Sequence, residues 1–285
     1  MRKVFLSLII SILLFVCQDA CADWTITQYS SETGNMAMIY TIVNTDTGAL
    51  AIIDGGYTGD QEQIRGIIEQ YGKVDAWILT HYHEDHAGAF NAVWNDTKDR
   101  IEKVYTTALD TKILEDNCQN WDDPGTLAMF LDQASSDERV IALHTGDEVD
   151  IVGLKMQVYL SGDDEILKYM INVWNNCSLV FKLKGSEEEI LFLGDLQNQE
   201  LGTYLLEKYG ENELHAKYVQ PSHHGNWGLA TEFYQSIKPE CLLFDAPEWL
   251  MTGEKYTARF LKEWCDQQGI TTYDYRDAPT TIIIR

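Results

Sequence analysis

Residues 80–88 carry the sequence Thr-His-Tyr-His-Glu-Asp-His-Ala-Gly, which places three histidines and one aspartate within six positions. The apolar run at residues 74–79 comes directly before them and predicts a buried strand, and residues 87–94 predict the start of a helix. The polar cluster would therefore lie on a tight loop at the carboxyl end of a strand. Folds that combine strands and helices usually place their chemistry at this end of a sheet.

The residue types in this loop are those that bind divalent metal ions. Imidazole and carboxylate groups are the usual protein ligands of zinc and similar cations. From an extended loop, His81 and His83 can turn inward together, whereas Asp85 and His86 start the next turn and can point to a second position. One short loop can thus supply ligands to two metal ions. A polar turn with solvated histidines is the alternative, and the density of the pattern argues against it.

The pattern His-x-His-x-Asp-His resembles the signature loop of the metallo-β-lactamase superfamily. This resemblance implies an α+β fold, the four-layer αββα sandwich, in which two sheets pack face to face and helices cover the outside. The rest of the chain fits this architecture, because a strand-rich part is followed by a last third in which helices and strands alternate. The alternation alone would predict only an α/β or an α+β fold.

The resemblance also gives roles to residues outside the loop. Asp54 ends the predicted strand at residues 49–53 and matches an aspartate that supports the metal loop from behind, although a plain turn residue would look the same. Asp195 follows an apolar strand and matches a carboxylate that bridges two cations. By position, His223 matches the last histidine of the second metal, and His224 would hold the substrate or the leaving group. The reverse order of these two histidines is the alternative.

One piece of the superfamily pattern is missing. Many members bring a third histidine to the first metal, but residues 173–180 contain none. They contain an Asn-x-Ser sequence that starts at Asn176 and is followed by an apolar strand, by Gly-Asp and by His-His-Gly. This order resembles a narrower branch, which includes the C-terminal hydrolase domain of DNA-uptake competence proteins and the choline-phosphate esterases of bacterial cell surfaces.

The resemblance then implies two ligand sets that share one carboxylate. The ligands of the first metal would be His81, His83 and Asp195, completed by Asn176, Cys177 or water. The ligands of the second would be Asp85, His86, Asp195 and His223. We expect two zinc ions, although the first set has fewer nitrogen and more oxygen donors and therefore also suits manganese.

The start of the chain predicts export. A basic start is followed by a mainly apolar run of thirteen residues at positions 4–16, which is too short for a comfortable membrane span, and by the small-x-small sequence Ala20-Cys21-Ala22. These features predict a secretory signal peptide at residues 1–22, cut after Ala22, and one hydrolase domain at residues 23–285. The protein would then be secreted or periplasmic. A lipoprotein anchored at Cys17 or Cys21 is the weaker alternative, because Val16 and Asp19 disfavour the two processing sites.

Composition narrows the range of partners. The net charge of −24 repels phosphate backbones, so long nucleic acid is an unfavourable substrate. No other segment is long and apolar enough to span a membrane. Signal cleavage would leave four cysteines, which form either two disulfides in one of three pairings or four buried free thiols. These cysteines are Cys118, Cys177, Cys241 and Cys265.

We therefore expect an exported metal-dependent hydrolase that uses a metal-bound hydroxide on a phosphodiester or phosphoester of small or cell-envelope type. Asp85 would also orient the attacking water. A lactonase or β-lactamase activity is one alternative, and a catalytically impaired protein that binds metal or ligand is another. Residues 110–134 are irregular and can cover the mouth of the site. Tyr57, Trp174 and Trp227 can form an aromatic wall there, although such residues more often belong to the core or the rim.

Overall fold

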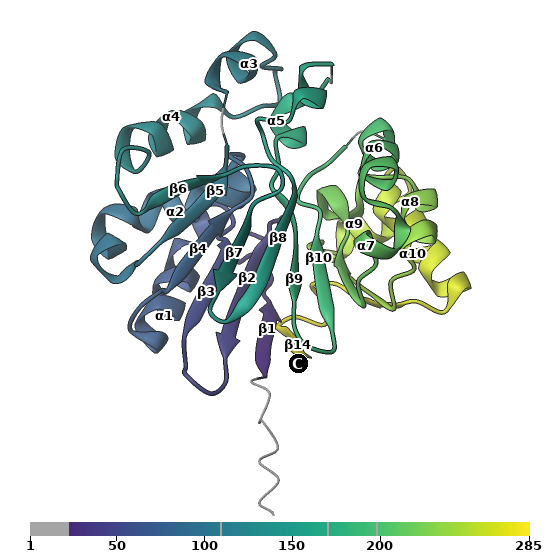
Figure 1. The fold of residues 1–285 in the computed structure, drawn as a ribbon, viewed down its shortest axis with the longest axis horizontal. Helices are drawn as coiled ribbons and strands as arrows, with labels where there is room; N and C mark the ends of the chain where they lie inside the picture. The colour runs from purple at the N-terminus through teal and green to yellow at the C-terminus, as the bar shows by residue number, and fades with distance from the viewer. Residues whose placement is uncertain (1–22, 109, 170, 198) are drawn as a thin grey trace, which may run out of the picture.

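The computed structural model describes residues 23–108, 110–169, 171–197 and 199–285. The predicted signal peptide at residues 1–22 lies outside the described residues. Two seven-stranded sheets face each other in the middle of the molecule, and helices cover the outer face of each (Figure 1). This is the αββα sandwich that was predicted. None of the described helices is long and apolar enough to cross a membrane.

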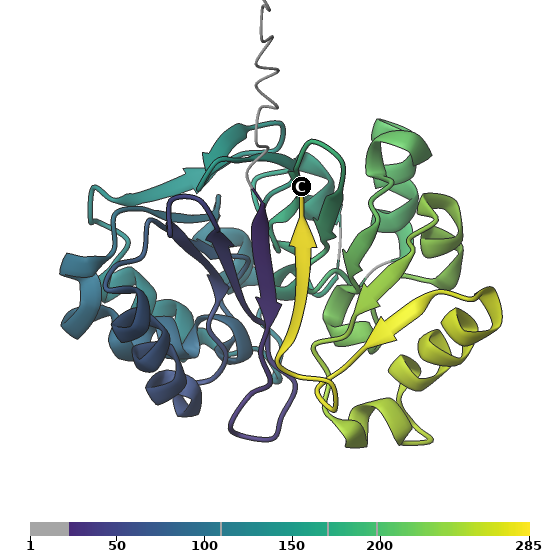
Figure 2. The same cartoon turned by 90° about the horizontal axis from the view of Figure 1, so that it is seen from below.

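The first sheet contains the N-terminal strands and the last strand of the chain. Its spatial order is β14 (Thr280–Ile284), β1 (Trp24–Gln28), β2 (Ile39–Asn44), β3 (Leu50–Asp54), β4 (Ala76–Leu79), β5 (Val104–Thr107) and β6 (Val140–Leu143). Figure 2 shows β14 beside β1, and the two pair antiparallel. Strands β3 to β6 run parallel, so their carboxyl ends meet at one edge.

The second sheet repeats this plan with the remaining strands. Its spatial order is β13 (Thr271–Tyr273), β12 (Cys241–Leu243), β11 (Tyr218–Gln220), β10 (Glu189–Phe192), β9 (Val180–Lys184), β8 (Leu154–Leu160) and β7 (Glu148–Ile151). Strands β10 to β13 are parallel. The loops that follow β4, β10 and β11 hold the predicted ligands, and the parallel strands bring these loops to the same end of the sandwich.

The helices divide between the two outer faces. Those on the first sheet are η1 (Thr58–Asp60), α1 (Gln61–Tyr71), α2 (Glu84–Thr97), η2 (Lys98–Arg100) and α4 (Pro124–Gln133). Those that lie above the strand ends or on the second sheet are α3 (Thr111–Asp116), η3 (Glu165–Tyr169), α5 (Val173–Asn176), α6 (Gln199–Tyr209), α7 (Glu211–Leu214), η4 (Ser222–Gly225), α8 (Thr231–Ile237), α9 (Glu248–Thr252) and α10 (Thr257–Gln268).

Apolar residues fill the space between the sheets and the space under the helices. Between the sheets, the rings of Tyr40 and Phe192 meet edge to face with their centroids 5.2 Å apart. Under α2, Trp77 of β4 packs edge to face on Phe90 at 5.0 Å. Because β4 is buried on both faces, its neighbouring loop starts from a rigid support.

The start of helix α2 differs from the one predicted from the sequence. Helix α2 starts at Glu84, three residues before the predicted start at residue 87, so Asp85 and His86 belong to its first turn. Acidic residues are favourable there because they face the positive end of the helix dipole.

The four cysteines of the described chain are free thiols, three of them buried and Cys118 exposed, which decides against the disulfide alternative.

Candidate metal centre

Asp54 at the end of β3 holds the loop that follows β4. Its Oδ1 accepts a hydrogen bond from the Thr80 amide at 2.8 Å, and its Oδ2 accepts one from Thr80 Oγ1 at 2.7 Å. The same Oδ2 lies 2.6 Å from His86 Nδ1. Since the carboxylate is the acceptor, we assign one proton to Nδ1, so Nε2 is the ring atom that binds either a second proton or a metal ion. Asp54 therefore holds the loop that carries the histidines in place, and its support of a metal site stays a prediction.

Four side chains converge on the other side of His86. Ligand atoms of Asp85, His86, Asp195 and His224 all lie within 4.8 Å of one another. His86 Nε2 is 3.2 Å from Asp195 Oδ1, and His224 Nε2 is 3.3 Å from both Asp195 Oδ2 and Asp85 Oδ2. These groups come from the start of α2, the turn after β10 and η4. We call them the four-residue cluster.

The charges in this cluster depend on one another. Burial alone would lower the pKa of His86 and of His224. The carboxylates of Asp195, Asp54 and Asp85 nevertheless raise the pKa of His86 well above its usual value, and Asp195 with Asp85 raises that of His224 to about 10. Conversely, burial would raise the pKa of Asp195, but His86 and His224 hold it well below its usual range. A cation at this position therefore competes with protons on the two imidazoles.

The unpaired atoms of the cluster fit a divalent cation. The buried atoms His86 Nε2, Asp195 Oδ1 and His224 Nε2 have no hydrogen-bond partner. Buried polar atoms are normally satisfied, so three such atoms facing one another need an explanation. Two imidazole nitrogens and two carboxylates form a donor set that suits zinc, manganese or iron.

His81 and His83 lie beside the cluster. His81 Nε2 is 3.2 Å from His83 Nδ1 and 3.9 Å from Asp195 Oδ2. Burial and the neighbouring His86 lower the pKa of His81 well below its usual value, so its imidazole is neutral and can donate a lone pair. His83 Nε2 lies 3.2 Å from Asp122 Oδ1. Both histidines thus stand where the first ligand set was predicted, although they are outside the four-residue cluster.

Asn176 and Ser178 hold the loop that carries Asp195. Asn176 Oδ1 accepts a hydrogen bond from the Gln197 amide at 3.0 Å, and its Nδ2 donates to the Ile171 carbonyl at 2.7 Å. Ser178 Oγ accepts from the Asp195 amide at 2.9 Å. A Cβ on Gly194 would lie 2.6 Å from Ser178 Cβ, which explains the glycine before Asp195. The amide of Asn176 is therefore occupied as a support of the loop.

Cys177, the other candidate ligand in this segment, also has a different partner. Its Sγ donates to the Trp174 carbonyl at 3.0 Å, and burial raises the pKa of the thiol to about 12. A buried thiol with so high a pKa is a poor metal ligand, since thiolate is the binding form.

In the structure His224, and not His223, lies in the four-residue cluster. Consecutive left-handed residues, with φ of 51° and 57°, turn the backbone so that His224 is buried in the four-residue cluster. His223 lines the cavity in front of it instead. Its Nδ1 contacts the Asn226 carbonyl, its Nε2 is 2.8 Å from Gln197 Nε2, and burial lowers its pKa. The alternative order from the sequence is therefore the one that the geometry favours.

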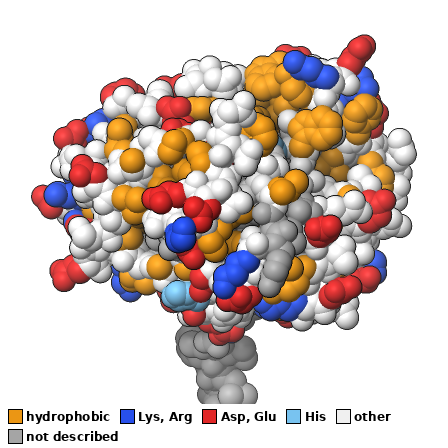
Figure 3. Space-filling model, turned by 90° about the horizontal axis from the view of Figure 1, so that it is seen from above, with side chains coloured by type: hydrophobic (Ala, Val, Ile, Leu, Met, Phe, Trp, Pro, Cys, Tyr) orange, Lys and Arg blue, Asp and Glu red, His pale blue; other side chains and the backbone are white. Residues whose placement is uncertain are grey.

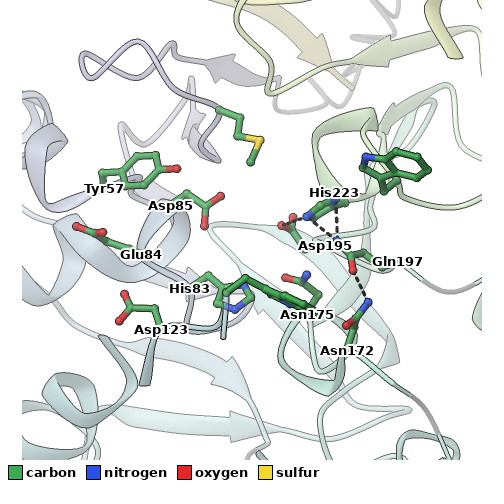
Figure 4. A pocket seen from close by; sticks show the side chains of 13 residues that line it. Tyr57, His83, Glu84, Asp85, Asp123, Asn172, Asn175, Asp195, Gln197 and His223 are labelled. Atoms are coloured by element: carbon green, nitrogen blue, oxygen red, sulfur yellow. Dashed lines mark hydrogen bonds and ion pairs between the residues drawn. The ribbon is translucent and has the colours of Figure 1, made fainter. Parts of the chain in front are cut away.

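A cavity of about 840 Å³ opens in front of these residues. In Figure 4, Tyr57, Glu84 and Asp85 lie on one side of it, and Asp195, Gln197 and His223 lie on the other. The irregular segment at residues 110–134 contributes Trp121 and Asp123, so it does border the mouth. No described residue that lines the cavity is Lys, Arg, Ser, Thr or Cys.

The aromatic wall differs from the expected one. Tyr57 and Trp227 line the cavity, whereas Trp174 is buried behind it and stacks on the His83 ring at 5.9 Å. Trp121 also lines the cavity, although no sequence motif predicted it there. The one sequence signal for its position was the irregular segment at residues 110–134, which was expected to cover the mouth of the site.

Comparison with known proteins agrees with the fold. A family model described as the Metallo-beta-lactamase superfamily matches residues 33–160. Together with the fold, this match supports membership of that superfamily. A search of curated proteins gave no match.

Solved structures show the same fold at low sequence identity. YhfI, a metallo-beta-lactamase fold protein from Bacillus subtilis, is 10% identical with a TM-score of 0.56, over 92% of this chain and 98% of YhfI. Igni18, a metallo hydrolase from Ignicoccus hospitalis, is 12% identical with a TM-score of 0.54, over 92% of this chain and 99% of Igni18. CmlA, a diiron beta-hydroxylase from Streptomyces venezuelae, is 12% identical with a TM-score of 0.56, over 92% of this chain and 54% of CmlA. At 12% identity or less these structures show the fold, and the superfamily match over residues 33–160 is what supports a metal-dependent hydrolase.

Replacing Asp54 by asparagine should weaken metal binding. The amide cannot accept hydrogen bonds at both oxygen positions, so His86 loses the partner that fixes its proton on Nδ1. We expect metal affinity to fall by roughly 10- to 100-fold, measured by competition with a chromophoric chelator. Asp60→Asn is the matched control, because Asp60 is an equally buried carboxylate bonded to Ser31 and to the amides of Glu32 and Tyr57. Equal affinities in the wild type and D54N would contradict the assignment.

The two adjacent histidines should respond differently to alanine. His224→Ala removes a member of the four-residue cluster, so the protein should lose its tightly held ion on dialysis. His223→Ala removes a residue of the cavity wall and should retain that ion. Metal content per chain, measured by plasma mass spectrometry on folded protein, separates the two results. Loss of the ion in H223A with retention in H224A would restore the order predicted from the sequence.

Proposed function

We propose that this protein is an exported metal-dependent hydrolase that cleaves a phosphodiester or phosphoester of a small or cell-envelope molecule. Export is proposed from residues 1–22, and the preference for phosphorus is proposed from the resemblance in motif order and from the cavity. The proposed cofactors are two divalent metal ions, zinc or manganese. The second set is Asp85, His86, Asp195 and His224, and the first is His81, His83 and Asp195.

The negative charge of the cavity wall is the observation that supports this choice of substrate. Glu84, Asp85, Asp123 and Asp195 line it, and none of the described lining residues is Lys or Arg. A phosphodiester bears one negative charge, which cations held by Asp85 and Asp195 would neutralise. A nucleic acid brings a row of charges, and a β-lactam antibiotic brings a carboxylate. These additional anions would meet acidic side chains without a basic partner, which disfavours both.

The side chains suit hydrolysis by water. When bound, the cations lower the pKa of water and stabilise the negative charge that develops in the transition state. Asp85 lies at the border between the cluster and the cavity, so its carboxylate can orient the attacking water. No described lining residue offers a hydroxyl of Ser or Thr or a thiol as the nucleophile.

His223 completes the arrangement. It is not needed in the four-residue cluster, and its Nε2 is 3.9 Å from Asp195 Oδ2. Gln197 holds its ring, because Asn172 Nδ2 donates to Gln197 Oε1 at 2.8 Å while Gln197 Nε2 reaches His223. Nδ1 of the same ring is engaged by the Asn226 carbonyl, so a hydrogen bond from His223 to the phosphoryl group or the leaving oxygen requires Nε2 to carry a proton and to exchange Gln197 for that oxygen. The role that was expected of His224 therefore passes to His223 in this proposal.

Hydrolysis of two chromogenic esters tests the proposal. The purified protein, loaded with zinc or with manganese, should cleave bis(p-nitrophenyl) phosphate or p-nitrophenyl phosphorylcholine. Asp195→Asn removes the shared carboxylate charge and should lower the rate by roughly 100-fold or more, since metal-assisted hydrolysis depends on the bound ions. The p-nitrophenolate absorbance measures both rates.

Two results with the wild-type protein would contradict the phosphoesterase proposal. Wild-type protein that holds metal and opens a lactone or nitrocefin, but neither phosphoester, would replace the phosphoesterase by the lactonase or β-lactamase alternative. Wild-type protein that holds metal and turns over none of these compounds would favour a protein that only binds metal or ligand.

A further inference from the structure

A second hollow adjoins the cavity of the metal centre. It has a volume of about 400 Å³ and shares two lining residues, Gln197 and Trp227, with the main cavity. The two spaces therefore meet at these side chains. A volume of this size is within the range of small-molecule sites.

The walls of this hollow are mainly apolar and carry no positive charge. Leu229, Ala230, Phe260 and Leu261 line it together with Trp227, and Glu232 is the charged residue among its described lining. Phe260 is 49% exposed and Trp227 is 61% exposed, which is unusual for large apolar side chains. Hydrophobic patches are also visible on the face seen in Figure 3. Exposed apolar surface that borders a reactive cavity is typical of a ligand-binding groove.

Hydrogen bonds hold the border between the two spaces in place. Trp227 has a left-handed φ of 56°, and its amide donates to Thr257 Oγ1. Asn226 Oδ1 accepts from the Thr257 amide at 3.0 Å, and Ser222 Oγ accepts from the Leu229 amide at 2.7 Å.

A close backbone contact adds to this rigidity. A Cβ on Gly228 would lie 2.2 Å from the Ser222 carbonyl, so only glycine allows the chain to pass here. A wall that is formed before binding loses little conformational freedom when a ligand arrives.

We propose that this hollow is a subsite for an uncharged, apolar substituent of the substrate, an alkyl or aryl group that extends from the phosphoester past Trp227. This inference rests on the proposed phosphoesterase function. It specifies a substituent of the substrate that the proposed function does not define. An anionic substituent is disfavoured because the described lining provides no cation and contains Glu232. A short substituent would leave the exposed faces of Phe260 and Trp227 in water.

Two phosphodiesters that differ only in chain length test the subsite. Hexyl p-nitrophenyl phosphate should be cleaved with a kcat/KM at least about 10-fold higher than methyl p-nitrophenyl phosphate, since each added methylene in an apolar pocket favours binding. Phe260→Ala should bring this ratio close to one, chiefly through a higher KM for the hexyl ester. Phe260→Leu should keep most of the preference, because it keeps apolar surface in the hollow.

The control is an exposed apolar residue elsewhere. Ile283 on β14 is 46% exposed and does not line either space, so Ile283→Ala should leave the ratio unchanged. Equal kcat/KM for the two esters in the wild type would overturn the subsite while the phosphoesterase proposal stands. A hexyl preference that survives F260A would also overturn it. Cleavage of neither ester would overturn the proposed function and this inference with it.

Discussion

The short contact between Asp54 and His86 is the interaction on which the candidate metal centre depends. One buried carboxylate binds the loop after β4 through Thr80 and fixes the proton of His86 on Nδ1. Only then does His86 Nε2 face Asp195. Isolated buried charges are costly, and this region buries several carboxylates and imidazoles together. In the absence of metal, protonated His86 and His224 balance the negative charge of the buried carboxylates. The same side chains can therefore keep the interior stable and bind a metal ion.

Much of this centre could be predicted because the chemistry follows the strands. In the segments before Asp54, His81 and Asp195, an apolar run ends in a reactive residue, and parallel pairing brings these ends to one edge of each sheet. The sandwich follows from the same alternation of apolar runs and from the family resemblance. Local periodicity and a dense motif are the properties that a sequence displays most directly.

Other features could not be predicted because they depend on backbone angles or on contacts between distant segments. The order of His223 and His224 is set by two consecutive left-handed residues, and neither is a glycine that would announce such a turn. The amide of Asn176 is occupied by Gln197 and Ile171, which no spacing reveals. Trp121 and the second hollow come from connections that share no motif. Loops in general vary more between related proteins than the strands and helices that they connect, so a sequence motif rarely marks their contribution to a cavity.

The most direct test of the metal centre is anomalous diffraction from crystals of the protein grown with zinc and measured on both sides of the zinc absorption edge. We predict a peak among Asp85, His86, Asp195 and His224, with ligand distances of about 2.0–2.2 Å. A second, weaker peak beside His81 and His83 would complete a dinuclear site. A difference map with no peak among these residues, or with His223 in the place of His224, would contradict the account.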